Sequence, residues 1–253
     1  MTRYALVTGA SSGLGIEFAK QLSKEGYGII ALARREDRLI ELGRKIDTEY
    51  KYYVCDLTDF DKAEDVYETI FEENRVEVVI NNAGFGLCGE FEDLRIEDEF
   101  RMIDTNIKAL QMLLKAALIY FRDSKIRGKI LNVSSSASLF PAGPYMATYY
   151  ASKAYVTSLV SAVHYENRDL YIGALCPGPV DTEFNKVANV KFALKGITPE
   201  YCVSYALKKM KKGKEIIIPK FSLKTACFFS RILPRKMVIG MVSKQQRRKI
   251  YEQ

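Results

Sequence analysis

Short apolar runs alternate with amphipathic segments along most of this 253-residue chain, and that alternation constrains the fold more than any other feature. Such runs are typical of strands buried on both faces of a parallel sheet, and the segments between them are typical of helices. Right-handed crossovers would join all the strands into one sheet, so the pattern predicts a doubly wound α/β domain. Seven strands are expected, at residues 4–8, 28–33, 51–55, 76–81, 129–134, 170–176 and 215–219.

Between the strands we expect helices at residues 36–50, 59–74, 96–122, 149–167 and 199–211. The last has a favourable start, because Pro199 stands at the first helical position after Thr198. The alternation stops near residue 220. We therefore expect one domain over residues 1–220 and a C-terminal extension over residues 221–253.

The C-terminal extension differs from the rest of the chain in charge. The formal net charge is +7, yet the residues from Lys208 onward hold 14 Lys and Arg against 2 Asp and Glu, which leaves −5 on the remainder. Apolar and basic residues interleave in the extension, and Pro234 separates two expected helical pieces. Such a segment can pack on the domain, close over a pocket, dock on a second subunit or lie in an anionic membrane interface. No nucleic-acid-reading module accompanies the charge, so no nucleic-acid partner is expected.

Composition excludes several kinds of site. The single histidine, His164, cannot build a multi-histidine centre, so no metal is expected. The five cysteines are scattered and form no C-x-x-C pair, which argues against a disulfide framework and favours a reducing compartment. No leader pattern and no apolar run of about 18 residues is found, so we expect a cytoplasmic protein.

A glycine-rich turn follows the first strand. Gly9, Gly13 and Gly15 form a G-x-x-x-G-x-G pattern where the strand passes into a helix. Glycine allows close backbone approach, and the free N–H groups of a helix start favour a pyrophosphate. A nucleotide site is expected here, with cofactor-binding residues Gly9, Ser11, Ser12, Gly13, Leu14 and Gly15.

The end of the second strand indicates which nucleotide binds. A fold that prefers NAD usually carries Asp or Glu at this place to hold the ribose 2′-hydroxyl, whereas this chain has Ala33 followed by Arg34 and Arg35. A guanidinium can bind a 2′-phosphate through charge-assisted hydrogen bonds. The sequence therefore predicts NADP(H), with Arg34 as the first choice for the phosphate and Arg35 as the second.

Tyr149 and Lys153 are the main catalytic candidates. Their i, i+4 spacing places both on one helix face. A free tyrosine has a pKa of about 10, and a nearby ammonium lowers it, so we expect Tyr149 to exchange a proton with a substrate oxygen. The adjacent Tyr150 has Ala154 at the matching position and cannot form such a pair.

Four motifs in this order resemble the short-chain dehydrogenase/reductase family over about residues 3–220. They are Thr8-Gly9 with Gly13 and Gly15, Asn81-Asn82-Ala83-Gly84, Ser134-Ser135-Ser136, and Tyr149 with Lys153. The resemblance implies a single Rossmann-type domain with a central seven-stranded parallel sheet flanked by helices on both faces. It also implies an NADP-dependent carbonyl reductase or alcohol dehydrogenase that transfers a hydride between cofactor and substrate.

The resemblance also implies roles for particular residues. Lys153 would hold the nicotinamide ribose, Asn106 in Asp104-Thr105-Asn106 would keep a water for proton relay, and a serine would bind the substrate oxygen. Counting from the fifth strand gives Ser135, while counting back from Tyr149 gives Ser136. One extra residue within 141–144 reconciles the counts, because a loop absorbs an insertion more easily than a strand end, so we assign Ser135.

Further positions follow from the same resemblance. Adenine contacts are expected at Asp56 and Leu57, and further cofactor contacts at Asn82, Ala83, Gly84, Pro177, Gly178, Val180 and Thr182. The residues expected around the substrate are apolar or aromatic and predict a hydrophobic ketone or secondary alcohol of up to steroid size. They are Phe85, Leu139, Phe140, Tyr145, Met146, Phe184 and Phe192. A homodimer or homotetramer formed through helices 96–122 and 149–167 is also implied.

Two other functions stay open at this point. The chain could bind NADP(H) as a sensor or structural protein without turnover. It could also be a membrane-peripheral reductase whose C-terminal extension collects lipid-like substrates.

Overall fold

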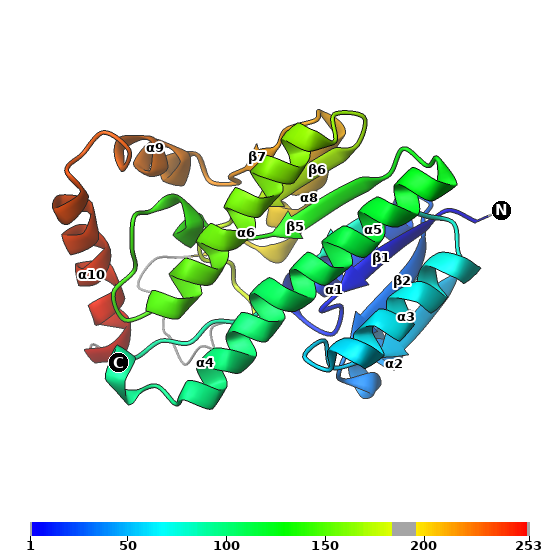
Figure 1. The fold of residues 1–253 in the computed structure, drawn as a ribbon, viewed down its shortest axis with the longest axis horizontal. Helices are drawn as coiled ribbons and strands as arrows, with labels where there is room; N and C mark the ends of the chain where they lie inside the picture. Colours follow the sequence, from blue (N-terminus) through cyan, green and yellow to red (C-terminus); the bar gives the residue numbers. More distant parts are fainter. Residues whose placement is uncertain (1, 184–195, 252–253) are drawn as a thin grey trace.

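Seven short apolar strands form one parallel sheet at the centre of the computed structural model, which describes residues 2–183 and 196–251. The spatial order is β3-β2-β1-β4-β5-β6-β7 (Figure 1), and the expected seven-stranded parallel sheet is confirmed. The strands are β1 (Tyr4–Thr8), β2 (Gly28–Ala33), β3 (Tyr50–Val54), β4 (Val76–Asn81), β5 (Lys129–Val133), β6 (Tyr171–Leu175) and β7 (Ile216–Ile217). The order reverses between β1 and β4, which places a crevice for ligands at their carboxyl ends.

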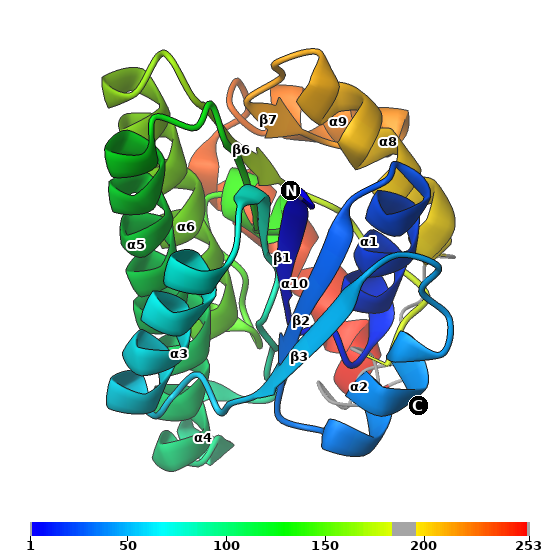
Figure 2. The ribbon, with the colours of Figure 1, turned by 90° about the vertical axis from the view of Figure 1, so that its right-hand side faces the viewer.

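Helices cover both faces of the sheet, as Figure 2 shows. One layer consists of α1 (Gly13–Lys24), α2 (Glu36–Gly43) and α8 (Pro199–Lys211), and the other of α3 (Phe60–Glu73), α5 (Leu110–Ser124) and α6 (Ala147–Glu166). Successive strand residues point to opposite faces. Leu6 and Ile30 therefore belong to the core beneath α3, α5 and α6, whereas Val7 and Ile29 belong to the core beneath α1, α2 and α8.

Two expected helices differ in the structure. The helix expected at 36–50 ends at Gly43, because the ring of Tyr50 packs there and its hydroxyl donates to the Leu39 carbonyl at 2.7 Å. The helix expected at 96–122 consists of α4 (Ile96–Ile103), a π-helical turn η2 (Asp104–Ala109) and α5. Two 3₁₀ turns, η1 (Phe91–Asp93) and η3 (Ser136–Leu139), occur in the loops that follow β4 and β5.

The C-terminal extension forms α9 (Phe221–Phe229) and α10 (Arg235–Tyr251), with Pro234 between them as expected. It packs on η3 and on the first turn of α6. Ser230 Oγ donates to the Leu139 carbonyl at 3.3 Å, and Gln246 Nε2 donates to the Tyr150 hydroxyl at 2.6 Å. No helix within residues 2–183 and 196–251 is long and apolar enough to cross a membrane.

Candidate active site

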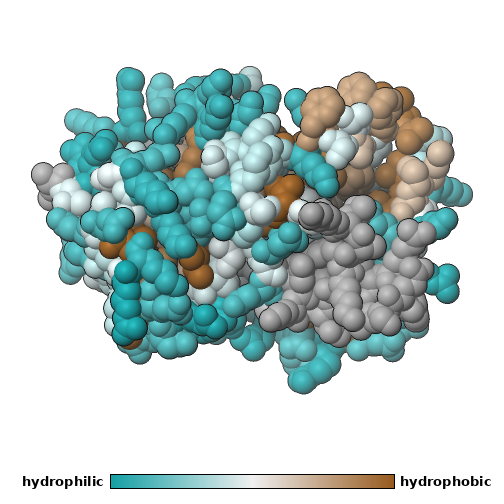
Figure 3. Space-filling view, turned by 180° about the vertical axis from the view of Figure 1, so that it is seen from behind, coloured by the Kyte–Doolittle hydropathy of each residue, from teal (hydrophilic) through white to brown (hydrophobic). Residues whose placement is uncertain are grey.

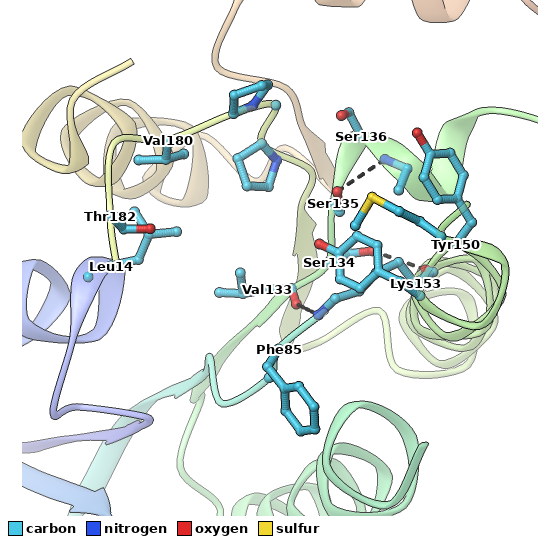
Figure 4. A pocket seen from close by; sticks show the side chains of 18 of the residues that line it. Leu14, Phe85, Val133, Ser134, Ser135, Ser136, Tyr150, Lys153, Val180 and Thr182 are labelled. Carbon is cyan, nitrogen blue, oxygen red and sulfur yellow. Dashed lines mark hydrogen bonds between the residues drawn. The ribbon is translucent and has the colours of Figure 1, made fainter. Parts of the chain in front are cut away.

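A cavity of about 980 Å³ lies at the carboxyl ends of the strands (Figure 4). All but two of the predicted catalytic and cofactor-binding residues line it. The lining residues among the cofactor predictions are Gly9, Ser11, Ser12, Gly13, Leu14, Arg34, Arg35, Asp56, Leu57, Asn82, Ala83, Gly84, Pro177, Gly178, Val180 and Thr182, and those among the catalytic predictions are Ser135, Tyr149 and Lys153. The two predicted residues outside the lining are Gly15 and Asn106.

The glycine-rich turn has the geometry that its sequence pattern predicts. Gly9 has a φ angle of +65°, and a Cβ atom on Gly15 would lie 2.2 Å from the Gly9 carbonyl oxygen. Asn82 fixes the turn against β4, because its Nδ2 donates to the Thr8 carbonyl at 2.9 Å. Ser12 stands at the N-cap of α1 without a side-chain capping bond. No capping side chain therefore competes with an anion for the N–H groups at this helix start.

The two arginines after β2 flank this turn differently. Arg35 Nη2 donates to the Ser11 carbonyl at 3.0 Å, and its Nη1 lies 3.2 Å from a Glu183 carboxylate oxygen. Arg34 Nη1 forms a longer contact of 3.7 Å with the Asp56 carboxylate. Arg34 is thus held more loosely than Arg35, and both guanidinium groups border the cavity.

Tyr149, Ser135 and Lys153 form the polar centre of the cavity. All three are buried, and the Ser135 hydroxyl is hydrogen-bonded to Tyr149. Lys153 Nζ donates to the Val133 carbonyl at 3.0 Å (Figure 4) and lies 5.9 Å from the centre of the Tyr149 ring. The fold therefore places a phenol, a hydroxyl and an amine at one point where β5 and α6 meet.

The neighbouring serines are arranged differently. Ser134 Oγ faces α6, where it donates to the Lys153 carbonyl at 3.0 Å and lies 2.8 Å from Thr157 Oγ1. The N–H group of Ser136 donates to the Pro177 carbonyl at 2.8 Å, at the start of η3. Among the three, Ser135 is the one whose hydroxyl is bonded to Tyr149.

The expected direction of the Tyr149 pKa shift is wrong. Burial raises the pKa of Tyr149 to about 12, although the hydrogen bond with Ser135 acts in the lowering direction. The same burial lowers the pKa of Lys153 to about 8. The spacing of the two residues predicts their proximity but not their desolvation, which is the larger effect on both side chains.

Asn106 supports the site from the π-helical turn η2. Its Oδ1 accepts from the Phe85 N–H at 3.0 Å, and its Nδ2 donates to the Phe85 carbonyl at 2.9 Å and to Ser152 Oγ at 3.1 Å. The amide is therefore fully engaged by protein groups. The widened turn places this side chain under the loop after β4, and π-helical turns of this kind occur often at functional sites.

The substrate side of the cavity matches the predictions in part. Phe85, Phe140 and Met146 line it, whereas Leu139 and Tyr145 do not. Leu139 packs against the core beneath α5 and α6 instead. The predictions at Phe184 and Phe192 fall outside the described residues.

The C-terminal extension supplies a wall of the cavity that no sequence motif assigned. Its apolar lining residues include Leu223, Ala226, Phe229, Leu233, Val238, Met241 and Val242. Gln246 is the buried polar member of this wall, and its Oε1 has no hydrogen-bond partner among the described residues. Of the four arrangements open for the extension, the structure thus shows two, packing on the domain and closure over the pocket. The amphipathic pattern of the sequence indicated that this segment packs against something, but it did not indicate which part of the molecule.

Electrostatically, the cavity has two parts. The end at the glycine-rich turn is bordered by Arg34 and Arg35, and the end at α9 and α10 is mostly apolar. Within the described ranges, no group of three or more His, Cys, Asp or Glu side chains lies together as a metal site.

Comparison with known proteins agrees with this geometry. The chain matches the model of the family described as short chain dehydrogenase over residues 3–192. An uncharacterized oxidoreductase of Staphylococcus epidermidis is 32% identical over 183 residues, which cover 71% of this chain and 79% of that protein. The very-long-chain 3-oxoacyl-CoA reductase of Kluyveromyces lactis is 34% identical over 227 residues, which cover 85% of this chain and 59% of that protein.

Among solved structures, a short-chain dehydrogenase from Sphingobium yanoikuyae in complex with NADPH is similar over nearly the whole fold. The TM-score is 0.81 and the sequence identity is 27%, with 92% of this chain and 94% of that chain covered. The similarity thus extends past the residues matched by the family model and into the C-terminal part of the chain.

Proposed function

The chain belongs to the short-chain dehydrogenase/reductase family of oxidoreductases, and from this premise we propose that it interconverts a carbonyl and a secondary alcohol with NADP(H). The observation that carries the proposal is the buried group of Ser135, Tyr149 and Lys153, which shares one cavity with the glycine-rich turn. A phenol and a hydroxyl bonded to each other are suited to bind a single substrate oxygen.

The residues present fit a dinucleotide. The close approach of Gly15 to Gly9 lets α1 begin directly after the turn, and no side chain caps the start of α1, where N–H groups would bind a pyrophosphate. Arg34, with Arg35 beside it, would bind a 2′-phosphate, which favours NADP(H) over NAD(H). When bound, the nicotinamide supplies or accepts the hydride. NADPH in the Sphingobium yanoikuyae relative supports this assignment.

The side chains of the protein transfer the proton. Ser135 and Tyr149 hold the substrate oxygen, and Tyr149 donates its proton during reduction or accepts one during oxidation. Lys153 is protonated at neutral pH, because its pKa of about 8 still lies above 7, and its charge stabilises the phenolate left on Tyr149. Both N–H groups of the Asn106 amide are donated to Phe85 and Ser152, so the water expected at this residue would bind one of its other polar atoms.

The substrate class follows from the cavity wall. An apolar lining contributed by α9 and α10 suits a hydrophobic carbonyl compound, of steroid or fatty-chain type. The unpartnered Gln246 Oε1 would accept a hydrogen bond from a hydroxyl or N–H group on that substrate. The very-long-chain 3-oxoacyl-CoA reductase among the relatives supports a long apolar substrate. We also propose a cytoplasmic enzyme and a division into a catalytic domain, 1–220, and a pocket-closing extension, 221–253.

A binding protein without turnover is the competing function. It would need the glycine-rich turn and Lys153, which is expected to hold the nicotinamide ribose, but it would not need the hydroxyl pair of Ser135 and Tyr149, whose burial carries a cost. The catalytic function therefore explains more of the structure.

The test is oxidation of NADPH and of NADH with a panel of ketones that includes steroids and 3-oxoacyl thioesters. We expect turnover with NADPH, slower turnover with NADH, and a loss of at least about 100-fold in Tyr149→Phe. Tyr165→Phe is the control, because this tyrosine lies on the same helix, is 72% exposed and does not line the cavity.

Three results would contradict parts of the proposal. NADPH binding without turnover on any substrate would favour the binding function. Equal rates for wild type and Tyr149→Phe would remove Tyr149 from the proton path. A preference for NADH would show that the assignment of Arg34 and Arg35 to the 2′-phosphate is wrong.

A further inference from the structure

Large apolar side chains gather on the outer side of the C-terminal extension. This surface appears as a hydrophobic region at the upper right of Figure 3, where α9 lies. Its exposed members are Phe221, Phe228, Phe229, Ile232, Met237 and Met241. Six large apolar residues exposed within 21 positions form a patch of the kind that marks an interaction site rather than ordinary surface. We call these six residues the apolar patch.

Positive charge accompanies the patch. Residues 216–251 contain nine Lys and Arg and no Asp or Glu. Those exposed beside the apolar patch are Lys220, Lys224, Arg231, Arg235, Lys236 and Lys244. Apart from Arg235, which donates to the Pro141 carbonyl at 3.1 Å, these six cations have no ion pair or side-chain hydrogen bond among the described residues. The surface thus combines exposed apolar side chains with uncompensated positive charge.

We propose that the apolar patch and its basic neighbours bind the surface of a membrane that contains anionic lipids. Helices that lie in a membrane interface present apolar side chains to the acyl boundary and Lys or Arg to the headgroups. Anionic headgroups attract each such cation in addition. The two short helices meet both requirements, and neither is long enough to span the bilayer.

Neither the domain itself nor a second copy of the chain fits this surface as well. The inner side of the extension is already used, because Cys227, Val238 and Val242 are buried against the domain. A symmetric pairing of two copies through the patch would bring two segments of charge +9 together, without an acidic residue to offset them. An anionic lipid surface is complementary to both features.

The position of the patch gives the contact a function, which rests on the hydrophobic substrate proposed above. Phe229 and Met241 belong to the apolar patch and also line the cavity. The mouth of the cavity therefore adjoins the proposed membrane surface. A substrate dissolved in the bilayer could reach Tyr149 without passing through water, where a long apolar molecule is poorly soluble.

The test is co-sedimentation of the full-length protein with vesicles of phosphatidylcholine alone or of phosphatidylcholine mixed with phosphatidylglycerol. No substrate or cofactor is present, so failure of the enzymatic proposal leaves this result intact. We expect binding to the mixed vesicles at least about tenfold stronger than to the neutral ones, and weaker binding at high salt.

Two double variants separate the two contributions to binding. Phe228→Ser with Ile232→Ser removes apolar contact, and Lys224→Glu with Arg231→Glu reverses charge. Neither pair includes a residue that lines the cavity. Each should reduce binding to the mixed vesicles by about tenfold or more, while NADPH binding is unchanged.

The matched control is Phe91→Ser with Phe100→Ser. These side chains are 64% and 57% exposed, as against 61% for Phe228 and 66% for Ile232, but they lie on η1 and α4. The control should bind vesicles like the wild type. Absence of wild-type binding, or equal binding by the patch variants, would overturn the proposal. A dimer that the patch variants dissociate, without vesicle binding, would overturn it in favour of a self-interface.

Discussion

Lys153 is a charged side chain in a place where charge is unfavourable. It is buried, and desolvation lowers its pKa to about 8, while its main hydrogen-bond partner is the Val133 carbonyl. In the proposed mechanism, an ammonium at this point would stabilise a developing phenolate on Tyr149, because it is close to the ring and poorly solvated. Function and stability therefore oppose each other at this residue.

This opposition predicts a pH dependence of stability. In the unfolded chain Lys153 titrates near its ordinary pKa of about 10.4, whereas in the folded chain it titrates near 8. Between these values the unfolded chain binds more protons, so the free energy of unfolding should rise with pH. Relative to Lys153→Met, the wild type should gain on the order of 2 kcal/mol between about pH 7 and pH 10.

Urea unfolding of both proteins at the two pH values measures this gain. The comparison removes the contributions of tyrosines with raised pKa values, such as Tyr149, since both proteins contain them. Wild-type and variant stabilities that change in parallel with pH would show that Lys153 is better solvated than its position indicates. Lys153→Met should also lack turnover.

At the residue scale, the sequence predicted which side chains lie together where those side chains are close neighbours along the chain. Tyr149 and Lys153 are one helical turn apart, and the glycines of the first turn are contiguous with β1. Gln246 was missed because it reaches Tyr150 from a helix 96 positions later in the chain. The Tyr149 pKa shift was predicted in the wrong direction, because burial depends on the whole surrounding structure.

At the scale of elements, η2 shows how one turn supports the active site. The π-helical turn holds Asn106 fully buried, where its amide satisfies both main-chain groups of Phe85. Those groups belong to the loop after β4, which borders the cavity. The turn therefore positions the loop as well as the helices on either side.

Replacing Asn106 by Ala should destabilise the protein. The Phe85 N–H and carbonyl would lose their partners in a partly buried place, at a cost of about 1–3 kcal/mol in the free energy of unfolding. Lys108→Ala is the control on the same turn, because its exposed ion pair with Asp104 should contribute less than about 1 kcal/mol. Chemical unfolding measures both. An Asn106→Ala variant as stable as Lys108→Ala would show that solvent replaces the amide.

The limits of helices and strands were predicted less well than their presence. The apolar pattern over 96–122 does not reveal the π-helical turn, since the bonds that Asn106 makes from this turn are with Phe85 and Ser152, which lie far from it in the sequence. The strand expected at 215–219 shortens to Ile216–Ile217, because only these two residues pair with β6. Contacts made by the neighbouring elements set these limits.

At the scale of the whole molecule, the sheet topology was predictable. Strands that alternate with helices and are joined by right-handed crossovers can be arranged in only a few ways. The position of the C-terminal extension was not. Its amphipathic pattern was compatible with four partners, and the cavity that it closes exists only once β5, α6 and the loop between them are folded. The extension thus joins the proposed substrate site to the proposed membrane surface.

The outward side of α5 and α6 leads to the last prediction, a homodimer or homotetramer formed through these helices. Ile119 on α5 and Tyr155 on α6 are exposed, and the Tyr155 hydroxyl bonds Gln111 of α5, so the two helices present one continuous surface. Light scattering after size exclusion should give a multiple of the 28.7-kDa chain mass.

Ile119→Asp with Tyr155→Asp should shift the protein to the monomer, because burying two carboxylates in an apolar contact is unfavourable. Ile40→Asp on α2, at 41% exposure against 42% for Ile119, is the control and should leave the assembly intact. A wild-type monomer, or equal dissociation by the control, would contradict assembly through α5 and α6.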